Sequence, residues 1–114
     1  KMNNRYKIGE GKGIFDFSVQ GEAIIIDEPF KFIGKVNSKI IITKSPSPAI
    51  YLLMKECAGV VSQNGGIVSH LAIIGMDMNV PVIVGVPDVY SAVKDGNMLQ
   101  LVSTNGKGII YEIE

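Results

Sequence analysis

The sequence has a single cysteine, Cys57, and no long apolar run. One cysteine excludes both an internal disulfide and a zinc site built from several cysteines. The purely apolar runs are a few residues long, far short of the roughly 20 residues that span a bilayer. The N-terminal stretch, KMNNRYKIGEGKG, also lacks the apolar core of an export signal. Because free thiols persist in reducing compartments, these absences together predict a cytoplasmic protein.

The chain also lacks an excess of charge of either sign. Its 11 basic and 11 acidic residues cancel, and Arg5 is the sole arginine. A nucleic-acid-binding protein normally carries a basic excess, often with arginines grouped on one face. The charge balance therefore argues against nucleic acid as a partner.

The length of 114 residues limits the protein to one small domain. That is too short for an enzyme that needs a nucleotide site and a second substrate site. Hydrophobic residues make up 46% of the chain and charged residues 19%, so the chain can bury a core. Isoleucine and valine total 29 against five leucines. Since branching at Cβ favours strands, the composition indicates a β-rich or α/β fold.

The order of the predicted elements indicates an α/β domain. Apolar runs and alternation predict strands at residues 13–19, 22–27, 39–43, 59–62, 81–86, 97–102 and 108–113. Helices are predicted at residues 49–57 and 69–78, with a helical turn at 88–93. Residues 20–21 form a predicted turn, 28–37 a loop or weak strand, and 1–12 a flexible tail. This order predicts a central sheet with two main helices and flanking antiparallel strands.

The two predicted helices have recognisable ends. Ser47 is a suitable N-cap, and Pro48 suits the first helical position because its missing N–H costs nothing there. The second helix starts near Ser69 and ends at Asn79, a residue that tolerates the left-handed conformation of a helix end.

The only histidine, His70, follows Ser69 at this second helix start, just after a turn that contains Gly65 and Gly66. Glycines let backbone N–H groups approach an anion closely. A helix N-terminus adds unpaired N–H groups and a partial positive charge, so a phosphate group fits there. This arrangement suits an imidazole that accepts and releases a phosphoryl group. The structural alternative is that Ser69 only caps the helix and His70 is an ordinary residue of its first turn.

Residues 57–85 resemble the phosphohistidine domain, also called the swivelling or mobile domain, of enzymes that use phosphoenolpyruvate (PEP). That family includes pyruvate phosphate dikinase, phosphoenolpyruvate synthase, enzyme I of the sugar phosphotransferase system and rifampin phosphotransferase. Its pattern is roughly G-V-V-T-x-x-G-G-x-T-S-H-x-A-I-x-A-R-x-x-x-I-P-A-V-V-G. The matching residues are Gly59, Gly65, Gly66, Ser69, His70, Ala72, Ile73, Pro81 and Gly85. Weaker similarity at residues 21–23, 47–48, 95–96 and 106–108 extends the resemblance over nearly the whole chain.

The resemblance implies that His70 is phosphorylated and that Gly65, Gly66 and Ser69 hold the phosphate. In the family, the domain swings between a nucleotide-binding domain of ATP-grasp type and a PEP/pyruvate-binding domain or another acceptor. The resemblance implies no cofactor on this domain itself, with Mg²⁺ and ATP or PEP on the partner domains. Residues 13–114 would then be the phosphohistidine domain of a phosphotransferase, catalytically incomplete alone.

Two residues depart from the family pattern. Val68 replaces the threonine before Ser-His, and Met76 replaces an arginine. An arginine there could neutralise or orient phosphate, which methionine cannot do. The departures leave open a second function, a non-catalytic regulatory or docking module of the same fold. A plain α/β interaction domain is the third alternative. An acid-labile, base-stable phosphate on the purified chain would favour the carrier.

Overall fold

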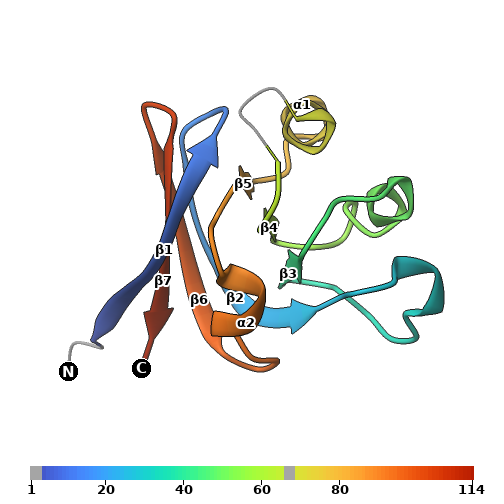
Figure 1. Cartoon of the computed structure of the whole chain (residues 1–114), viewed down its shortest axis with the longest axis horizontal. Helices are drawn as coiled ribbons and strands as arrows, with labels where there is room; N and C mark the ends of the chain where they lie inside the picture. The colour runs from blue at the N-terminus through green and yellow to red at the C-terminus, as the bar shows by residue number, and fades with distance from the viewer. Residues whose placement is uncertain (1–3, 66–68) are drawn as a thin grey trace.

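The computed structural model describes residues 4–65 and 69–114. In this part of the chain, seven strands close into a barrel in the order β1-β5-β4-β3-β2-β6-β7 (Figure 1). The strands are β1 (Arg5–Gly13), β2 (Phe17–Ile25), β3 (Lys39–Thr43), β4 (Gly59–Ser62), β5 (Val82–Val84), β6 (Met98–Thr104) and β7 (Lys107–Ile113). The helices are α1 (His70–Met78), α2 (Val89–Ala92) and two 3₁₀ helices, η1 (Pro29–Lys31) and η2 (Pro48–Leu52).

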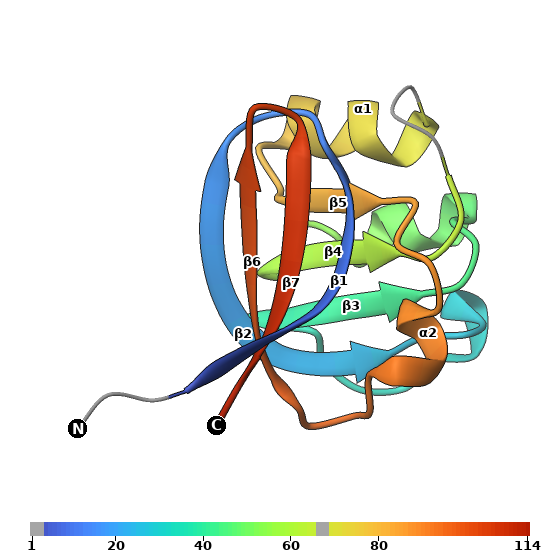
Figure 2. The same cartoon turned by 60° about the vertical axis from the view of Figure 1, so that its left-hand side comes forward.

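The barrel has a parallel part and an antiparallel part. Strands β2, β3, β4 and β5 pair in parallel, whereas all pairs that involve β1, β6 and β7 are antiparallel. Figure 2 shows the arrowheads of β3, β4 and β5 pointing to the same side, across the direction of β6 and β7. The α/β class with flanking antiparallel strands is therefore confirmed. The loops that leave the parallel strands all start from one edge, the carboxyl edge of the sheet.

Two apolar layers form the core, one on each face of the parallel strands. Ile40, Ile41 and Ile42 of β3 have no exposed surface, and because side chains alternate along a strand, Ile41 enters one layer and its neighbours the other. The inner layer consists of Ala23, Ile40, Ile42, Val61, Ile83, Val86, Val89, Val93, Leu99, Leu101 and Ile110. The outer layer consists of Ile26, Val36, Ile41, Ile50, Met54, Val60, Leu71, Ala72, Val80, Val82 and Val84.

Helix α1 packs closely on β5. It buries Leu71, Ala72 and Gly75, and a Cβ atom on Gly75 would overlap the Val82 side chain and lie 3.0 Å from the Val80 carbonyl oxygen. The missing side chain thus lets the helix backbone approach the strand.

Among the described residues, none of the helices combines the length and the apolar character that a membrane span requires.

The flexible tail predicted for residues 1–12 is wrong from Arg5 onward. Arg5–Gly13 is β1, which pairs with β7 from Arg5 opposite Ile113 to Lys12 opposite Lys107. Most β1 side chains are exposed or half-buried, so the segment carries no apolar pattern. Its partner strand comes from the other end of the chain, which local sequence does not reveal.

The first predicted strand, 13–19, is wrong in its bounds, and the predicted turn at residues 20–21 is absent. Residues 17–19 belong to β2, together with most of the second predicted strand, 22–27. Residues 14–16 connect β1 to β2. Strand β2 then pairs with β6 in unbroken register, from Phe17 opposite Ser103 to Glu22 opposite Met98. The chain therefore runs straight through residues 20–21, because their pairing with β6 outweighs a weak local turn signal.

The α-helix predicted at residues 49–57 is wrong in type and length. The chain forms only η2, followed by turns, and the Ser47 side chain makes no capping hydrogen bond. The Ala58 N–H donates to the Lys39 carbonyl oxygen at 2.7 Å, which returns the chain to the start of β3. Because the chain must come back in so few residues, a longer helix does not fit.

The remaining predictions agree with the structure. The strands predicted at 39–43, 59–62, 81–86, 97–102 and 108–113 are present as β3 to β7, with ends shifted by a few residues in β5 to β7. Asn79 ends α1 with φ of 58°, the left-handed conformation that its position predicts. Residues 28–37 form a loop that includes η1.

Candidate functional site

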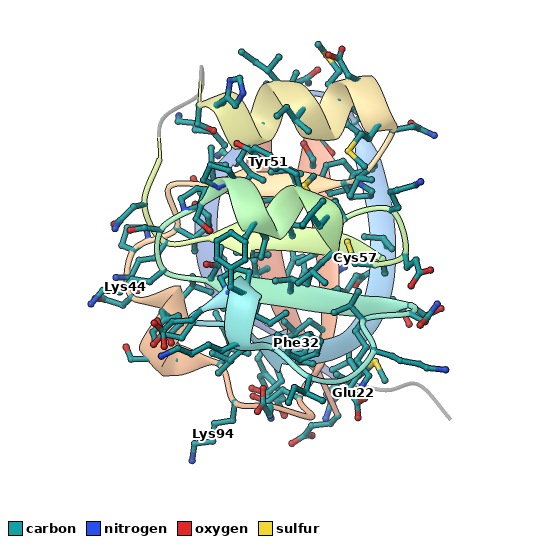
Figure 3. The ribbon with its side chains drawn as sticks, turned by 90° about the vertical axis from the view of Figure 1, so that its right-hand side faces the viewer. Glu22, Phe32, Lys44, Tyr51, Cys57 and Lys94 are labelled. Carbon is teal, nitrogen blue, oxygen red and sulfur yellow. The ribbon has the colours of Figure 1, made fainter. Side chains whose placement is uncertain are left out.

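Three of the predicted site residues, Gly65, Ser69 and His70, lie at the carboxyl edge of the parallel strands. Strand β4 ends at Ser62, the chain passes Gly65, and α1 begins at His70. Figure 3 shows Tyr51 between η2 and α1, and Lys44 on the side of the molecule where α1 begins. Ligand sites of α/β sheets form at this edge, since the loops that leave the strands there are free to vary.

His70 is the first residue of α1, and its side chain is exposed. The centroid of its imidazole ring lies 5.9 Å from the centroid of the Tyr51 ring, with the two planes at 57°. An exposed imidazole at this edge is accessible to a second protein domain. A histidine nucleophile needs this access if donor and acceptor sites lie on other domains.

Ser69 is the N-cap of α1, as its sequence position predicts. Its backbone is extended, with φ of −64° and ψ of 149°, and its Oγ accepts a hydrogen bond from the Ala72 N–H at 3.2 Å. A hydroxyl that accepts one bond keeps its own proton to donate. Capping the helix and donating to a phosphate oxygen are therefore compatible roles for Ser69.

Gly65 has φ of +122°, a conformation that side-chain-bearing residues rarely adopt. It lies within reach of Ser69, because a Cβ atom on Gly65 would be 3.6 Å from the Ser69 Cβ. The structure thus brings two of the three predicted phosphate-binding residues together. The third, Gly66, lies outside the described residues, as does Val68.

Backbone hydrogen bonds fasten the loop after β4 to the loop after β3. The Gln63 N–H donates to the Thr43 carbonyl oxygen at 3.0 Å, and the Asn64 N–H to that of Lys44 at 2.9 Å. The Asn64 side chain adds a bond from Nδ2 to the Ser45 Oγ at 2.8 Å. Residues 63–64, which follow β4, are consequently held to residues 43–45, which lead to η2.

A second group of bonds fastens the same loop to the segment after β5. The Ser62 carbonyl oxygen accepts from the Val86 N–H at 3.2 Å, and the Gln63 Oε1 accepts from the Tyr90 N–H at 3.1 Å. The fully buried Ser62 hydroxyl donates to the Asn64 carbonyl oxygen. The start of the loop before α1 is therefore fixed from both neighbouring strands.

Three residues of this edge, Ser45, Asn64 and Tyr51, were not predicted from the sequence. A usable signal existed for the first two, since polar residues follow two successive buried strands whose carboxyl ends meet at one edge. Tyr51 had no such signal, because its approach to His70 depends on how η2 packs.

The position of the family's arginine is occupied by Met76, which lies on α1 with 46% of its surface exposed. Arg5 does not replace that arginine. Its guanidinium carbon lies 4.0 Å from the centroid of the Tyr111 ring, and its Nη1 donates to the Gln100 Oε1 at 3.0 Å. Both contacts are on the antiparallel strands, away from α1 (Figure 2).

Cys57 is a packing residue rather than a reactive thiol. It is half-buried against the outer apolar layer, and its Sγ donates to the Met54 carbonyl oxygen at 3.4 Å. Burial raises the pKa of the Cys57 thiol to about 11, so the thiolate that reactive cysteines need is scarce at neutral pH. Within residues 4–65 and 69–114, no group of three or more His, Cys, Asp or Glu side chains is arranged to hold a metal ion.

Several pyruvate kinases are similar to this chain over most of its length. The pyruvate kinase of Staphylococcus epidermidis is 31% identical over 102 residues, which cover 89% of this chain and 17% of that protein. The pyruvate kinase of Geobacillus stearothermophilus is 29% identical over 105 residues, or 91% of this chain and 18% of that protein. The chain thus spans under a fifth of the length of these relatives.

Two solved structures are similar to the fold. An NMR structure of Enzyme I is 29% identical with a TM-score of 0.55, over 65% of this chain and 31% of that chain. A muramoyltetrapeptide carboxypeptidase from Oxalobacter formigenes has a TM-score of 0.64 over 96% of this chain and 50% of that chain. Its identity is 12%, so the likeness concerns the fold alone.

A family model described as "PEP-utilising enzyme, mobile domain" matches residues 36–106, well over half of the chain. The matched region contains the loop after β3, the loop after β4 and α1. The resemblance to the phosphohistidine domain found in the sequence is confirmed by this match and by the likeness to Enzyme I. The chain belongs to the family of mobile domains of PEP-utilising enzymes.

Proposed function

We propose that this domain accepts a phosphoryl group on His70 from a nucleotide- or PEP-binding partner and passes it to an acceptor. Membership of the mobile-domain family supports a phosphoryl carrier role in general. The assignment to His70 rests on one observation, the position of this residue. The chain's only histidine is the exposed first residue of α1, next to the N-cap Ser69.

In the loading step, an imidazole nitrogen of His70 attacks the phosphorus of the donor. A nitrogen–phosphorus bond forms, the bond from phosphorus to the donor's leaving oxygen breaks, and the imidazole gives up its proton. The Ser69 hydroxyl and the first N–H groups of α1 donate to the phosphoryl oxygens. In the unloading step, a nucleophile of the acceptor attacks the same phosphorus and His70 leaves.

The donor and acceptor sites belong to partner domains in this proposal. The partners are a nucleotide-binding domain of ATP-grasp type and a PEP/pyruvate-binding domain or another acceptor, with Mg²⁺ bound on their side. The exposed imidazole supports this division of labour. The half-buried free thiol of Cys57 fits the cytoplasmic location that the proposal includes.

The second candidate function is a regulatory or docking module that carries no phosphoryl group. The observation in its favour is Met76, which stands where the family has an arginine. Position 76 of α1 therefore supplies no positive charge. Arg5 does not supply it either, because it contacts Tyr111 and Gln100.

The experiment is phosphoryl transfer to the purified chain, with wild type beside His70→Ala. Cell extract supplies the partners, with ³²P-labelled PEP in one reaction and ATP labelled on the β- or γ-phosphorus in two others. The carrier function predicts label on wild type alone that is lost in acid and kept in base. Label retained on His70→Ala overturns the assignment, and absence of label from folded wild-type protein in all reactions favours the docking module.

A further inference from the structure

We infer that Tyr51 is a positioning residue for His70, whose ring contact holds the imidazole in the orientation used for phosphoryl transfer. The inference rests on the proposed function and adds a residue that the matched sequence pattern does not include. Two observations support it: the contact between the Tyr51 and His70 rings, and the packing of the elements that carry them.

The contact is between two aromatic rings on different elements. The ring centroids of Tyr51 and His70 are 5.9 Å apart and the planes are tilted by 57°, within the range of about 4.5–7 Å at which aromatic pairs attract. His70 itself is exposed. A fixed aromatic neighbour therefore limits the rotamers of an imidazole that otherwise faces water.

Tyr51 is held by the packing of η2. The residues around it on the chain, Ala49, Ile50 and Met54, have 5%, 0% and 0% of their surface exposed. Tyr51 is half-buried and packs against the same outer layer. One side of its ring is therefore packed against this layer, which restricts the rotamers of Tyr51.

The two elements that carry the rings, η2 and α1, pack on the same outer apolar layer. The loop into η2 and the loop toward α1 are joined by the bond from Asn64 Nδ2 to Ser45 Oγ, 2.8 Å, and from Asn64 N to the Lys44 carbonyl oxygen, 2.9 Å. The shared apolar layer, together with these bonds between the preceding loops, keeps η2 beside α1 and the two rings within reach of each other.

Orientation matters because the attacking nitrogen must point at the phosphorus of a donor that a partner domain presents. Transfer forms the nitrogen–phosphorus bond as the donor's phosphorus–oxygen bond breaks, in line, and the imidazole proton passes to solvent. Small errors in such an approach cost large factors in rate. Loss of the Tyr51 ring should therefore slow transfer from a partner without harming the fold.

The experiment compares three variants with wild type. Tyr51→Leu keeps apolar bulk but removes the ring, whereas Tyr51→Phe keeps the ring and removes only the hydroxyl. Leu52→Ala is the control, because it changes the neighbouring residue, whose surface is 76% exposed. Two readouts are taken: the rate of label transfer from PEP or ATP through cell extract, and the rate with phosphoramidate, which phosphorylates an exposed imidazole without a partner and releases ammonia.

The chain's single histidine gives a third readout. Its two carbon-bound ring protons are identified by NMR without ambiguity, so a nuclear Overhauser contact with the Tyr51 ring is measurable directly. The contact should be present in wild type and in Tyr51→Phe. In Tyr51→Leu the imidazole signals should move toward those of free histidine, while the backbone amide spectrum shows that the domain is folded.

We expect partner-dependent transfer to Tyr51→Leu to fall at least about tenfold, with Tyr51→Phe and Leu52→Ala within about twofold of wild type. The phosphoramidate rate should change much less, because a small donor approaches from any direction. Equal partner-dependent rates for wild type and Tyr51→Leu overturn the inference alone. Absence of any transfer to wild type overturns the proposed function and the inference with it.

Discussion

Gly85 lies against Gly65: a Cβ atom on Gly85 would be 2.6 Å from the Gly65 carbonyl oxygen. This contact joins the loop after β5 to the loop that leads from β4 to His70. Gly85 also has φ of +68°, which disfavours any side chain. The family pattern has glycine at both positions, and the structure supplies a steric reason for the pair.

Gly85→Ala should therefore destabilise the domain more than a glycine replacement elsewhere. Gly96→Ala is the matched control, because Gly96 has φ of +90° but a Cβ atom there would have no neighbour within 4 Å. Each variant loses about 1–2 kcal/mol for a strained φ, and overpacking should add about 1–3 kcal/mol at Gly85 alone. Urea unfolding measures both losses, and equal losses would mean that the two loops separate freely.

Ser69 should have two separable roles, capping α1 and donating to phosphate. Ser69→Ala should lower the free energy of unfolding by about 0.5–2 kcal/mol, since the Ala72 N–H loses its acceptor. Ser69→Asp should restore that stability, because aspartate is a good N-cap. Its carboxylate repels phosphate, so we expect phosphoryl transfer to be lost.

The two roles are measured by urea unfolding and by label transfer on the same preparations. If Ser69→Asp accepts label as fast as wild type, the hydroxyl does not bind the phosphoryl group and Ser69 is a capping residue only.

Met76→Arg should speed partner-dependent transfer several-fold if the missing arginine limits the carrier. The residue is 46% exposed, so the change should alter the free energy of unfolding by no more than about 0.5 kcal/mol. Met76→Gln, similar in length but uncharged, is the control for the added polarity. A rate that is the same in all three proteins would show that this domain transfers without a cation at that position.

The domain should lose stability between pH 9 and 11 because of Cys57. Its thiol has a pKa of about 11 when folded and an ordinary value of 9.0. In that window the unfolded chain has lost the thiol proton and the folded chain keeps it, so rising pH favours unfolding.

Comparison with Cys57→Ala isolates this effect from lysine and tyrosine ionisation. From pH 8 to pH 10, wild type should lose about 1 kcal/mol more than the variant. Parallel losses in the two proteins would show that the thiol ionises equally in both states.

The parts of the fold that sequence predicts well have local signals. Helix α1 begins at a serine N-cap and ends at Asn79 in the left-handed conformation. The turn between β6 and β7 has φ of 52° at Asn105 and 83° at Gly106, the conformation that this pair of residues favours. A few neighbouring residues determine each of these features, so the chain alone reveals them.

The parts that sequence misses depend on distant partners. Strand β1 is polar and exists because β7 pairs with it from the far end of the chain. Helical composition after Pro48 produces only a 3₁₀ turn, since the chain returns to β3 through the bond from Ala58 to Lys39. Neither constraint is visible in the segment itself.

The candidate site likewise has residues that local sequence reveals and one residue that it does not. The sequence motif identifies His70, Ser69 and Gly65, which the structure brings to one edge, while their roles in transfer stay predictions. Tyr51 was missed because its closeness to His70 arises from the packing of η2 beside α1.

The most direct test of the carrier function is whether label on His70 leaves again. Wild-type chain is labelled through extract with the donor that works, purified in base, and chased with fresh extract and unlabelled acceptors such as ADP or pyruvate. A carrier predicts about one acid-labile phosphoryl group per chain, absent from His70→Ala, that moves to an acceptor during the chase. Label that stays on the protein, or that His70→Ala also carries, would contradict a carrier function on His70.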